Sequence, residues 1–360
     1  MNKTFDNTST QPSSNVSDSE SEVSTVSTSK LDRATDSQGN QLSGTDRPTV
    51  ALLSPSDLAI ELGEPLDGPS KTVVSDLINA HGFVVFRGYG IASDSDFHRF
   101  IECFGLDNFR YADSFSNAVR HNRSERVFTA NEAPQNVEIF LHHEMAQTLT
   151  FPGALFFFCE KAAESGGATP VCRSDLTLKS LEDKNPTFVT KLREMGVKYR
   201  NSMPSEANLE SGQGRSWKDT LTVKTEREAE EKLSSLGYRF NWLDDGTLSV
   251  QTPALAAVDH FGRGKEVFFN QIVAAAAGWT VAADDREPRL CFGDDTPMKQ
   301  EDLTDAINAA YQHTVDLDWQ TGDVALLDNL KVMHGRRPFE GSRSVLASLC
   351  NPITRPALNT

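Results

Sequence analysis

The sequence predicts an α+β domain with a double-stranded β-helix (jelly roll) core of two antiparallel sheets and flanking helices. Two observations lead to this fold class. Helical patterns appear early in the globular part of the chain, with short apolar strands and glycine-rich turns around them. From Thr314 onwards the chain consists mainly of short apolar runs separated by turns. Short antiparallel strands with helices beside them can bury their apolar faces as two packed sheets.

The chain divides into an N-terminal tail and one large domain. Residues 1–48 are rich in serine and threonine and contain one aromatic residue, Phe5. Such a segment cannot bury enough apolar surface to offset the entropy lost on ordering, so we expect a disordered tail. It has no apolar core typical of a secretion signal, and its acidic residues disfavour a transit peptide. Residues 49–360 are long enough for a single domain with a sizeable core.

Four segments have the spacing of amphipathic helices. In the first, 70–80, Val73, Val74, Leu77 and Ile78 recur at helical intervals, and Gly82 ends the pattern. The other three predicted helices are 94–104, 226–236 and 301–313.

Strands are predicted where short apolar runs are bounded by turn residues. The run Phe83-Val84-Val85-Phe86, ended by Gly88, is typical of a buried strand. The turn Ser165-Gly166-Gly167 follows a second apolar run, residues 155–159. The remaining predicted strands are 155–159, 315–319, 324–327 and 344–350.

Composition excludes several kinds of partner. The net charge is −16, from 35 basic and 51 acidic residues, which argues against nucleic acid or an anionic membrane as a partner. No apolar run approaches the length of a membrane span. The five cysteines are odd in number and lack a CxxC pair, so we expect no disulfide framework. The chain is therefore predicted to be cytoplasmic, in a reducing compartment, with an organelle left open.

The segment 140–145 contains the most informative residues. On an extended strand successive side chains alternate between faces, so His142 and Glu144 should point the same way and His143 the opposite way. With His334 they form the set of two imidazoles and one carboxylate that holds iron in non-haem oxygenases. We expect His142, Glu144 and His334 to be the metal ligands and the catalytic centre, and His143 to be a packed, hydrogen-bonded neighbour.

Three motifs resemble those of the taurine dioxygenase family, and within it the clavaminate-synthase-like branch. They are Leu141-His142-His143-Glu144-Met145-Ala146, Gly166-Gly167-Ala168-Thr169-Pro170 and the segment 328–336. The resemblance covers the chain from about residue 50 to its end. It implies an Fe(II)- and 2-oxoglutarate-dependent dioxygenase that uses O₂. It also implies C–H oxidation of a small, amino-acid-like substrate in natural-product biosynthesis, by hydroxylation, desaturation or ring closure.

The same resemblance indicates the 2-oxoglutarate site. Arg343, nine residues after His334, matches the family's arginine for the distal carboxylate of 2-oxoglutarate. A forked guanidinium suits a carboxylate. Arg336 is the second candidate, while Arg337 is expected on an exposed turn. Thr169 matches the family position for a hydroxyl that binds 2-oxoglutarate.

The substrate side is less defined. Relatives that bind a sulfonate or a second carboxylate carry another arginine four residues after the 2-oxoglutarate arginine, and here that position is Ala347. Taurine is therefore not the expected substrate. The candidate substrate-binding residues, any of which can instead be an ordinary loop or core residue, are Arg200, Asn201, Arg215, Trp217 and Asn270.

Two other functions use the same residues. A non-catalytic jelly-roll sensor would bind iron and 2-oxoglutarate without turnover. A zinc hydrolase would use the same three ligands, but no additional general base is evident by motif.

Overall fold

The computed structural model describes residues 50–110, 115–116, 120–131, 133–207, 214–279 and 288–358, and the backbone of β1 (Val23–Thr25). The rest of the predicted tail, residues 1–48, lies outside the described residues. Its disorder and the domain boundary at residue 48 therefore stay predictions.

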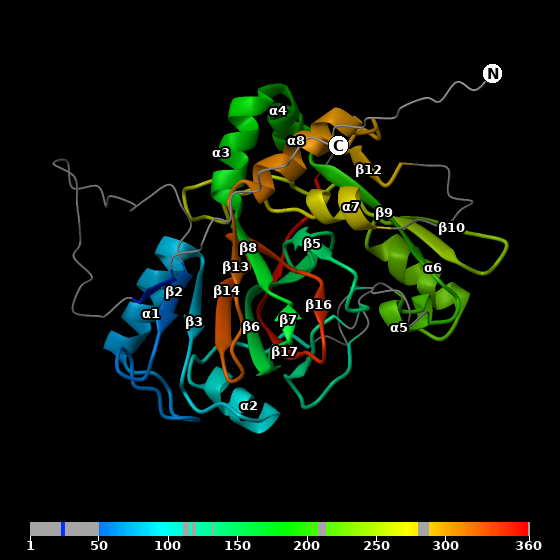
Figure 1. The fold of residues 1–360 in the computed structure, drawn as a ribbon. Coiled ribbons are helices and arrows are strands. Elements are labelled where there is room, and N and C mark those ends of the chain that lie inside the picture. Colours follow the sequence, from blue (N-terminus) through cyan, green and yellow to red (C-terminus); the bar gives the residue numbers. More distant parts are fainter. Residues whose placement is uncertain are drawn as a thin grey trace, which may run out of the picture.

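A large sheet forms one layer of the molecule (Figure 1). Its seven strands pair in the order β1-β2-β3-β14-β6-β17-β4, antiparallel except for the parallel pairs β1–β2 and β2–β3. After β1, the strands in that order are β2 (Val50–Leu53), β3 (Phe83–Phe86), β14 (Val324–Asp328), β6 (Thr150–Lys161), β17 (Ser344–Thr354) and β4 (Phe128–Thr129).

A smaller antiparallel sheet carries the candidate ligands. Its order is β13 (Thr314–Leu317), β8 (Thr169–Arg173), β15 (Val332–Arg336) and β5 (Ile139–His142). Phe157 and Ala347 of the large sheet share one hydrophobic cluster with Val171 and Val332 of the small one. The two sheets therefore pack face to face and bury a common core, as the α+β prediction requires.

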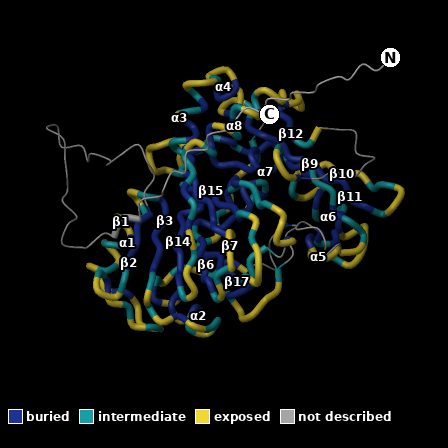
Figure 2. The backbone as a smooth tube through the Cα atoms, viewed as in Figure 1, coloured by how far each residue is buried: buried dark blue, intermediate teal, exposed yellow. Residues whose placement is uncertain are grey.

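Helices cover the outer faces of both sheets. Helices α1 (Gly68–His81) and α2 (Asp94–Glu102) pack on the large sheet through Leu77, Phe97 and Phe100. The small sheet is covered, at the top of Figure 1, by α3 (Ser174–Lys184), α4 (Pro186–Met195), α7 (Ile272–Gly278) and α8 (Gln300–Tyr311). Figure 2 shows the strands of both sheets mostly buried and the turns around them exposed.

A second, smaller unit packs beside this sandwich. Four strands form its sheet in the order β10 (Arg239–Trp242), β11 (Leu248–Gln251), β9 (Val197–Met203) and β12 (Leu290–Phe292). Helices α5 (Trp217–Leu221) and α6 (Glu226–Ser235) close a hydrophobic cluster against it. The short strands β7 (Ser165–Gly166) and β16 (Phe339–Glu340) pair separately.

Local chemistry explains where α1 begins and ends. The Asp67 carboxylate caps its start by accepting from the Ser70 N–H, and Pro69 occupies the first turn. Gly82 ends it with a φ of 84°, where a β-carbon would also collide with Val332. The predicted helix end at Gly82 is confirmed.

The other sequence predictions of elements hold with shifted ends. All four predicted helices and the five predicted strands are present, and the predicted turn after residue 164 contains two glycines with positive φ. All five cysteines are buried and none forms a disulfide. No described helix is long and apolar enough to span a membrane.

Candidate metal centre

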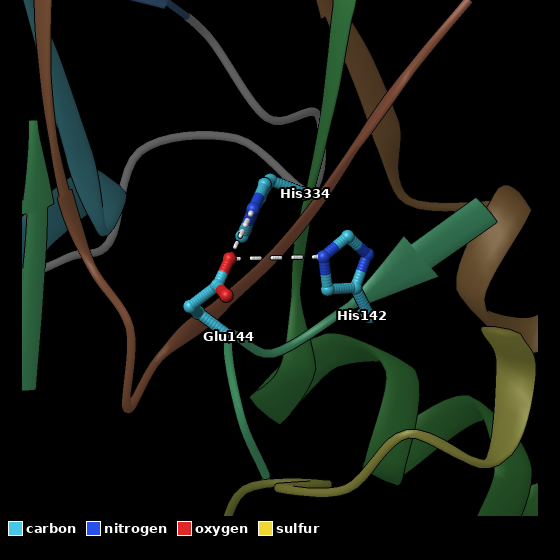
Figure 3. A group of neighbouring side chains, drawn as sticks. All are labelled: His142, Glu144 and His334. Carbon is cyan, nitrogen blue, oxygen red and sulfur yellow. Dashed lines mark ion pairs between the residues drawn. The ribbon is translucent and has the colours of Figure 1, made fainter. Parts of the chain in front are cut away.

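Three predicted ligands converge at the inner face of the small sheet (Figure 3). Glu144 Oε2 lies 4.0 Å from His142 Nε2 and 3.6 Å from His334 Nε2. One donor atom from each residue lies within 4.8 Å of the other two. Two imidazole nitrogens and a carboxylate oxygen, pointing at a common position, fit a non-haem Fe(II) ion with open coordination positions.

Strand pairing brings the two histidines together. His142 at the end of β5 is the direct antiparallel partner of His334 on β15, and side chains of such partners lie on the same face. Their ring centroids are 4.5 Å apart. A separation of 192 residues in sequence therefore becomes contact across one strand pair.

Glu144 reaches the site by a different route from the one predicted. Strand β5 ends at His142, so Glu144 lies in the following turn and not on the strand. Asn329 fixes this turn, because its Oδ1 accepts from the Glu144 N–H at 2.7 Å and its Nδ2 donates to the Glu144 carbonyl at 3.0 Å. Met145 follows with a φ of 59°, a conformation uncommon for a residue with a side chain. Glu144 faces the histidines as expected, but a turn positions it.

His143 points away from the metal ligands and is fully buried. Its Nδ1 lies 2.5 Å from the Asn329 carbonyl, and its Nε2 lies 2.5 Å from Ser174 Oγ and 3.1 Å from the Phe268 carbonyl. Burial lowers the pKa of His143 to about 3. A neutral imidazole has one N–H, so His143 can donate from Nδ1 to the Asn329 carbonyl and accept at Nε2 from the Ser174 hydroxyl, which ties the ligand turn to both residues.

The protonation of the ligands suits a metal ion. Burial, with the neighbouring His334, lowers the pKa of His142 to about 4, so its ring is neutral at physiological pH. The Phe140 carbonyl lies 2.8 Å from His142 Nδ1, which places the proton there and leaves Nε2 as the donor to metal. Burial alone would raise the pKa of Glu144, but Arg120 and the two histidines outweigh it and hold that pKa far below its usual range.

Arg343 and Thr169 line the same cavity as the triad, which has a volume of about 300 Å³. Nε of Arg343 donates to the Gly167 carbonyl at 3.0 Å, and no described residue accepts a hydrogen bond from its terminal nitrogens. Burial and the nearby charge of Arg336 lower the pKa of Arg343 to about 10. Trp319 Nε1 donates to Thr169 Oγ1 at 2.9 Å, so the Thr169 hydroxyl hydrogen remains for another acceptor.

Arg336, the second candidate for 2-oxoglutarate, has other partners. Its Nη1 donates to the carbonyls of Asn131 and Ala133, and its Nη2 donates to those of Pro134 and Val137, at 2.7–3.3 Å. The guanidinium lines the cavity, but these bonds hold residues 131, 133, 134 and 137 against β15. Arg337, expected on an exposed turn, is half-buried and pairs with Asp316 and Glu138.

Of the substrate candidates, Asn201 alone is among the described residues that line the cavity. Alternation along β9 turns its neighbour Arg200 to the other face. Arg215 donates to the carbonyls of Ser116 and Asp219. Trp217 is buried in the hydrophobic cluster of the smaller unit, and the Asn270 amide is used within the chain, by Ala257 and Ile272. The structure thus places these four residues outside the cavity wall.

Sequence reasoning missed Arg120, which lines the cavity and contacts Glu144. It also missed Asn329, although this residue lies inside a motif used for the family resemblance. An arginine on an irregular segment has no periodic signal, and its position depends on how that segment folds. Of the two residues, only Asn329 could have been identified from the sequence. It lies between the apolar runs of β14 and β15, and a polar residue in such a position often fixes a turn.

Comparisons with known proteins agree with this geometry. The family model "Taurine catabolism dioxygenase TauD, TfdA family" matches residues 45–349. Clavaminate synthase-like protein At3g21360 of Arabidopsis thaliana is 36% identical over 312 residues, which cover 84% of this chain and 94% of that protein. Dapdiamide synthesis protein DdaC of Enterobacter agglomerans is 26% identical over 324 residues, 87% of this chain and 93% of that protein.

A solved structure with a similar fold is that of PvcB, described as an Fe, alpha-ketoglutarate dependent oxygenase from an isonitrile synthetic pathway. Its TM-score is 0.50, with 16% identity, and the match covers 91% of this chain and 94% of that one. This likeness concerns the fold.

Proposed function

Because this chain belongs to the taurine catabolism dioxygenase TauD/TfdA family, we propose that it oxidises a C–H bond of a small, amino-acid-like substrate in natural-product biosynthesis. Membership makes it a 2-oxoglutarate-dependent dioxygenase, with Fe(II), 2-oxoglutarate and O₂ as its cofactor and cosubstrates. The two packed, mainly antiparallel sheets support the jelly-roll core that we predicted for it.

The main support for the proposal is that the candidate metal ligands and the candidate 2-oxoglutarate residues line one cavity. The triad residues His142, Glu144 and His334 share its wall with Arg343 and Thr169. Arg343 is half-buried in the cavity wall, and a guanidinium there whose terminal nitrogens have no described acceptor favours an anionic ligand, since a charge partly withdrawn from water is costly when unpaired. A dicarboxylate that reaches from the metal centre to Arg343 would meet that need.

Each residue then has a defined task. His142, Glu144 and His334 would hold Fe(II), which, when bound, supplies the redox chemistry that couples 2-oxoglutarate decarboxylation to C–H oxidation. Arg343 would bind the distal carboxylate of 2-oxoglutarate through a charge-assisted fork, and the Thr169 hydroxyl would donate a further hydrogen bond. Apolar side chains of the wall, Phe157 and Trp279 among them, exclude water from the site.

The substrate class rests on two further points. The first is the relative DdaC, which is named a dapdiamide synthesis protein. Within the described residues, Gln147 lines the cavity with a buried Oε1 that has no hydrogen-bond partner. An amino or amide N–H of the substrate would satisfy this acceptor, as buried polar groups generally require.

Substrate-stimulated turnover tests the proposal. Amino acids and N-substituted amino acids are screened for stimulation of CO₂ release from 2-oxoglutarate by the Fe(II)-loaded enzyme, and products are identified by mass. We expect at least one such compound to be oxidised, taurine to be inert because of Ala347, and His142→Ala, Glu144→Ala and His334→Ala to be folded and inactive. Tight binding of 2-oxoglutarate without turnover of any compound would favour the sensor. Activity restored by Zn(II) instead of Fe(II) would favour the hydrolase.

A further inference from the structure

Arg120 lies beside the candidate metal centre and contacts one of its ligands, Glu144. Its Nη2 donates to both carboxylate oxygens of Glu144, at 3.0 Å and 2.9 Å, and its side chain is only 6% exposed. The guanidinium also lies over the ring of Phe128, 5.4 Å from the ring centroid. The residue belongs to the segment before β4 and lines the same cavity as the triad.

Phe128 connects Arg120 with a position already noted in the sequence. In the β4–β17 pair, Phe128 is the direct antiparallel partner of Ala347, so their side chains lie on the same face. Both belong to the core cluster between the two sheets. Arg120 therefore holds its charge over the direct neighbour of Ala347, the position at which the chain lacks a strand arginine.

The charges of the cavity wall favour an anion. Among described residues, Arg120, Arg336 and Arg343 line it with two acids, Glu138 and Glu144. Glu138 is already paired with Arg337, which stands outside the lining set. Fe(II) and 2-oxoglutarate carry equal and opposite charges, so their binding leaves the positive excess in place.

The three cavity arginines differ in the groups that they contact. Arg336 gives its terminal nitrogens to four backbone carbonyls. Arg343 is assigned to 2-oxoglutarate. Arg120 faces Glu144, whose charge a metal ion would neutralise, and this weakens the hold of Glu144 on the guanidinium.

We propose that Arg120 recognises a carboxylate of the substrate and thereby replaces the strand arginine that is missing at Ala347. The identity of the biological substrate rests on the proposed function, whereas the binding of a carboxylate by Arg120 does not. The ligand class is a small organic carboxylate with an apolar body, for which Phe140 and Trp279 supply an apolar wall. The carboxylate would sit beside the metal centre, over Phe128.

Binding of a matched acid and amide tests the assignment without turnover. Calorimetry measures 3-phenylpropionate and 3-phenylpropionamide on the enzyme loaded with Mn(II) and N-oxalylglycine, an inert analogue of 2-oxoglutarate. Wild type should bind the acid about tenfold or more tightly than the amide, as expected for a buried charge pair. Arg120→Gln should bind both alike. The control Arg123→Gln, an exposed residue on the same segment that pairs with Asp94 and Glu160, should behave as wild type.

The alternative is that Arg120 only positions Glu144. In that case Arg120→Gln would weaken Mn(II) binding and reduce the affinity for acid and amide equally, with the preference kept. That result, a wild type without preference, or no detectable binding of the acid by wild type would each overturn the assignment. The two proposals can fail separately. If no amino acid is oxidised in the screen but the preference for the acid still depends on Arg120, the substrate of the proposed function is wrong and the carboxylate site remains.

Discussion

At the scale of single residues, Arg336 and Arg343 show how hydrogen bonding separates two similar side chains. Both arginines follow His334 within nine residues, line one cavity and lie near the Phe339 ring. The terminal nitrogens of Arg336 are spent on backbone carbonyls, whereas those of Arg343 have no described acceptor. The first guanidinium organises the protein, and the second is available to a ligand.

Arg343→Ala should therefore weaken 2-oxoglutarate binding more than Arg336→Ala. Removal of one partner of a buried charge pair costs roughly 2–5 kcal/mol, so the apparent affinity should fall by more than about tenfold. Titration of 2-oxoglutarate, read as stimulated CO₂ release, measures it.

Arg336→Ala should mainly lower the melting temperature, because it leaves backbone carbonyls of the segment 131–137 without donors, at about 1–3 kcal/mol for each that stays buried and unpaired. A larger loss of 2-oxoglutarate affinity in Arg336→Ala than in Arg343→Ala would reverse the two assignments.

Asn329 is a positioning residue for the metal centre. Its amide also donates to the Pro152 carbonyl at 2.7 Å, in addition to its two bonds to the Glu144 backbone. Asn329→Ala should lower the melting temperature and weaken Mn(II) binding, since Glu144 loses the bonds that orient it. Asn79→Ala, on the exposed side of α1, is the control. Unchanged Mn(II) affinity in Asn329→Ala would show that the turn holds its shape without the amide.

At the scale of elements, an apolar period and a sharp boundary made several helices and strands predictable from the sequence. Helix α1 has a cap, an apolar spacing and a terminal glycine, and its predicted span is close to the observed one. The helices α3 and α4 were not predicted, although Asn185 caps α4. Their buried residues do recur at helical intervals, at 174, 177, 178 and 181 in α3 and at 188, 189 and 192 in α4, so the sequence contained a signal for both helices.

The metal triad was predicted from strand alternation and from the motifs around His142, Glu144 and His334, yet the local reasoning was only half right. Alternation along a strand explains His142, whereas Glu144 depends on Asn329, 185 residues away. On the substrate side, four of the five candidates lie outside the cavity wall, and their roles stay predictions. Arg120 reaches the site through the packing of an irregular segment, which no local pattern records.

Helix α1 ends in a histidine that should make stability depend on pH. His81 lies in the last turn, where the helix dipole favours a positive charge. Burial, with the charges of Arg173 and Lys331, outweighs this and lowers the pKa of His81 below its ordinary 6.5. The unfolded chain therefore binds a proton first as pH falls below 6.5, and stability drops until the folded-state pKa is reached.

His81→Gln removes this dependence. Melting temperatures of wild type and variant, measured between about pH 7.5 and about pH 5, should show a smaller fall for the variant. An identical slope in both proteins would mean that His81 does not contribute.

At the scale of the whole molecule, the composition of residues 1–48 predicts that they are dispensable. Strand β1 adds three residues to the edge of the large sheet, beside β2. A three-residue edge strand contributes little to a sheet held by β3, β14, β6 and β17. Deletion of residues 1–48 should leave turnover and melting temperature nearly unchanged, as measured side by side with the full chain. A clear drop in either would assign the segment a structural role.

The pairing of β5 with β15 has a consequence beyond catalysis. Strand β5 lies at the edge of its sheet, and its ladder to β15 consists of two partner pairs, His334–His142 and Arg336–Ile139, with an irregularity between them. A metal ion bound by His142 and His334 would cross-link this edge strand to its neighbour. Binding of the ion to the native state would also stabilise the fold by mass action. When Mn(II) is added, amide exchange across 139–146 should slow by a larger factor than exchange in β6, which reports only the gain in global stability. Equal exchange across 139–146 with and without Mn(II) would show that the metal ion does not stabilise the pairing of β5 with β15. Without the metal ion we expect this edge strand to open more often and to be cut more readily by proteases, so scarcity of iron would shorten the lifetime of the protein as well as stop its catalysis.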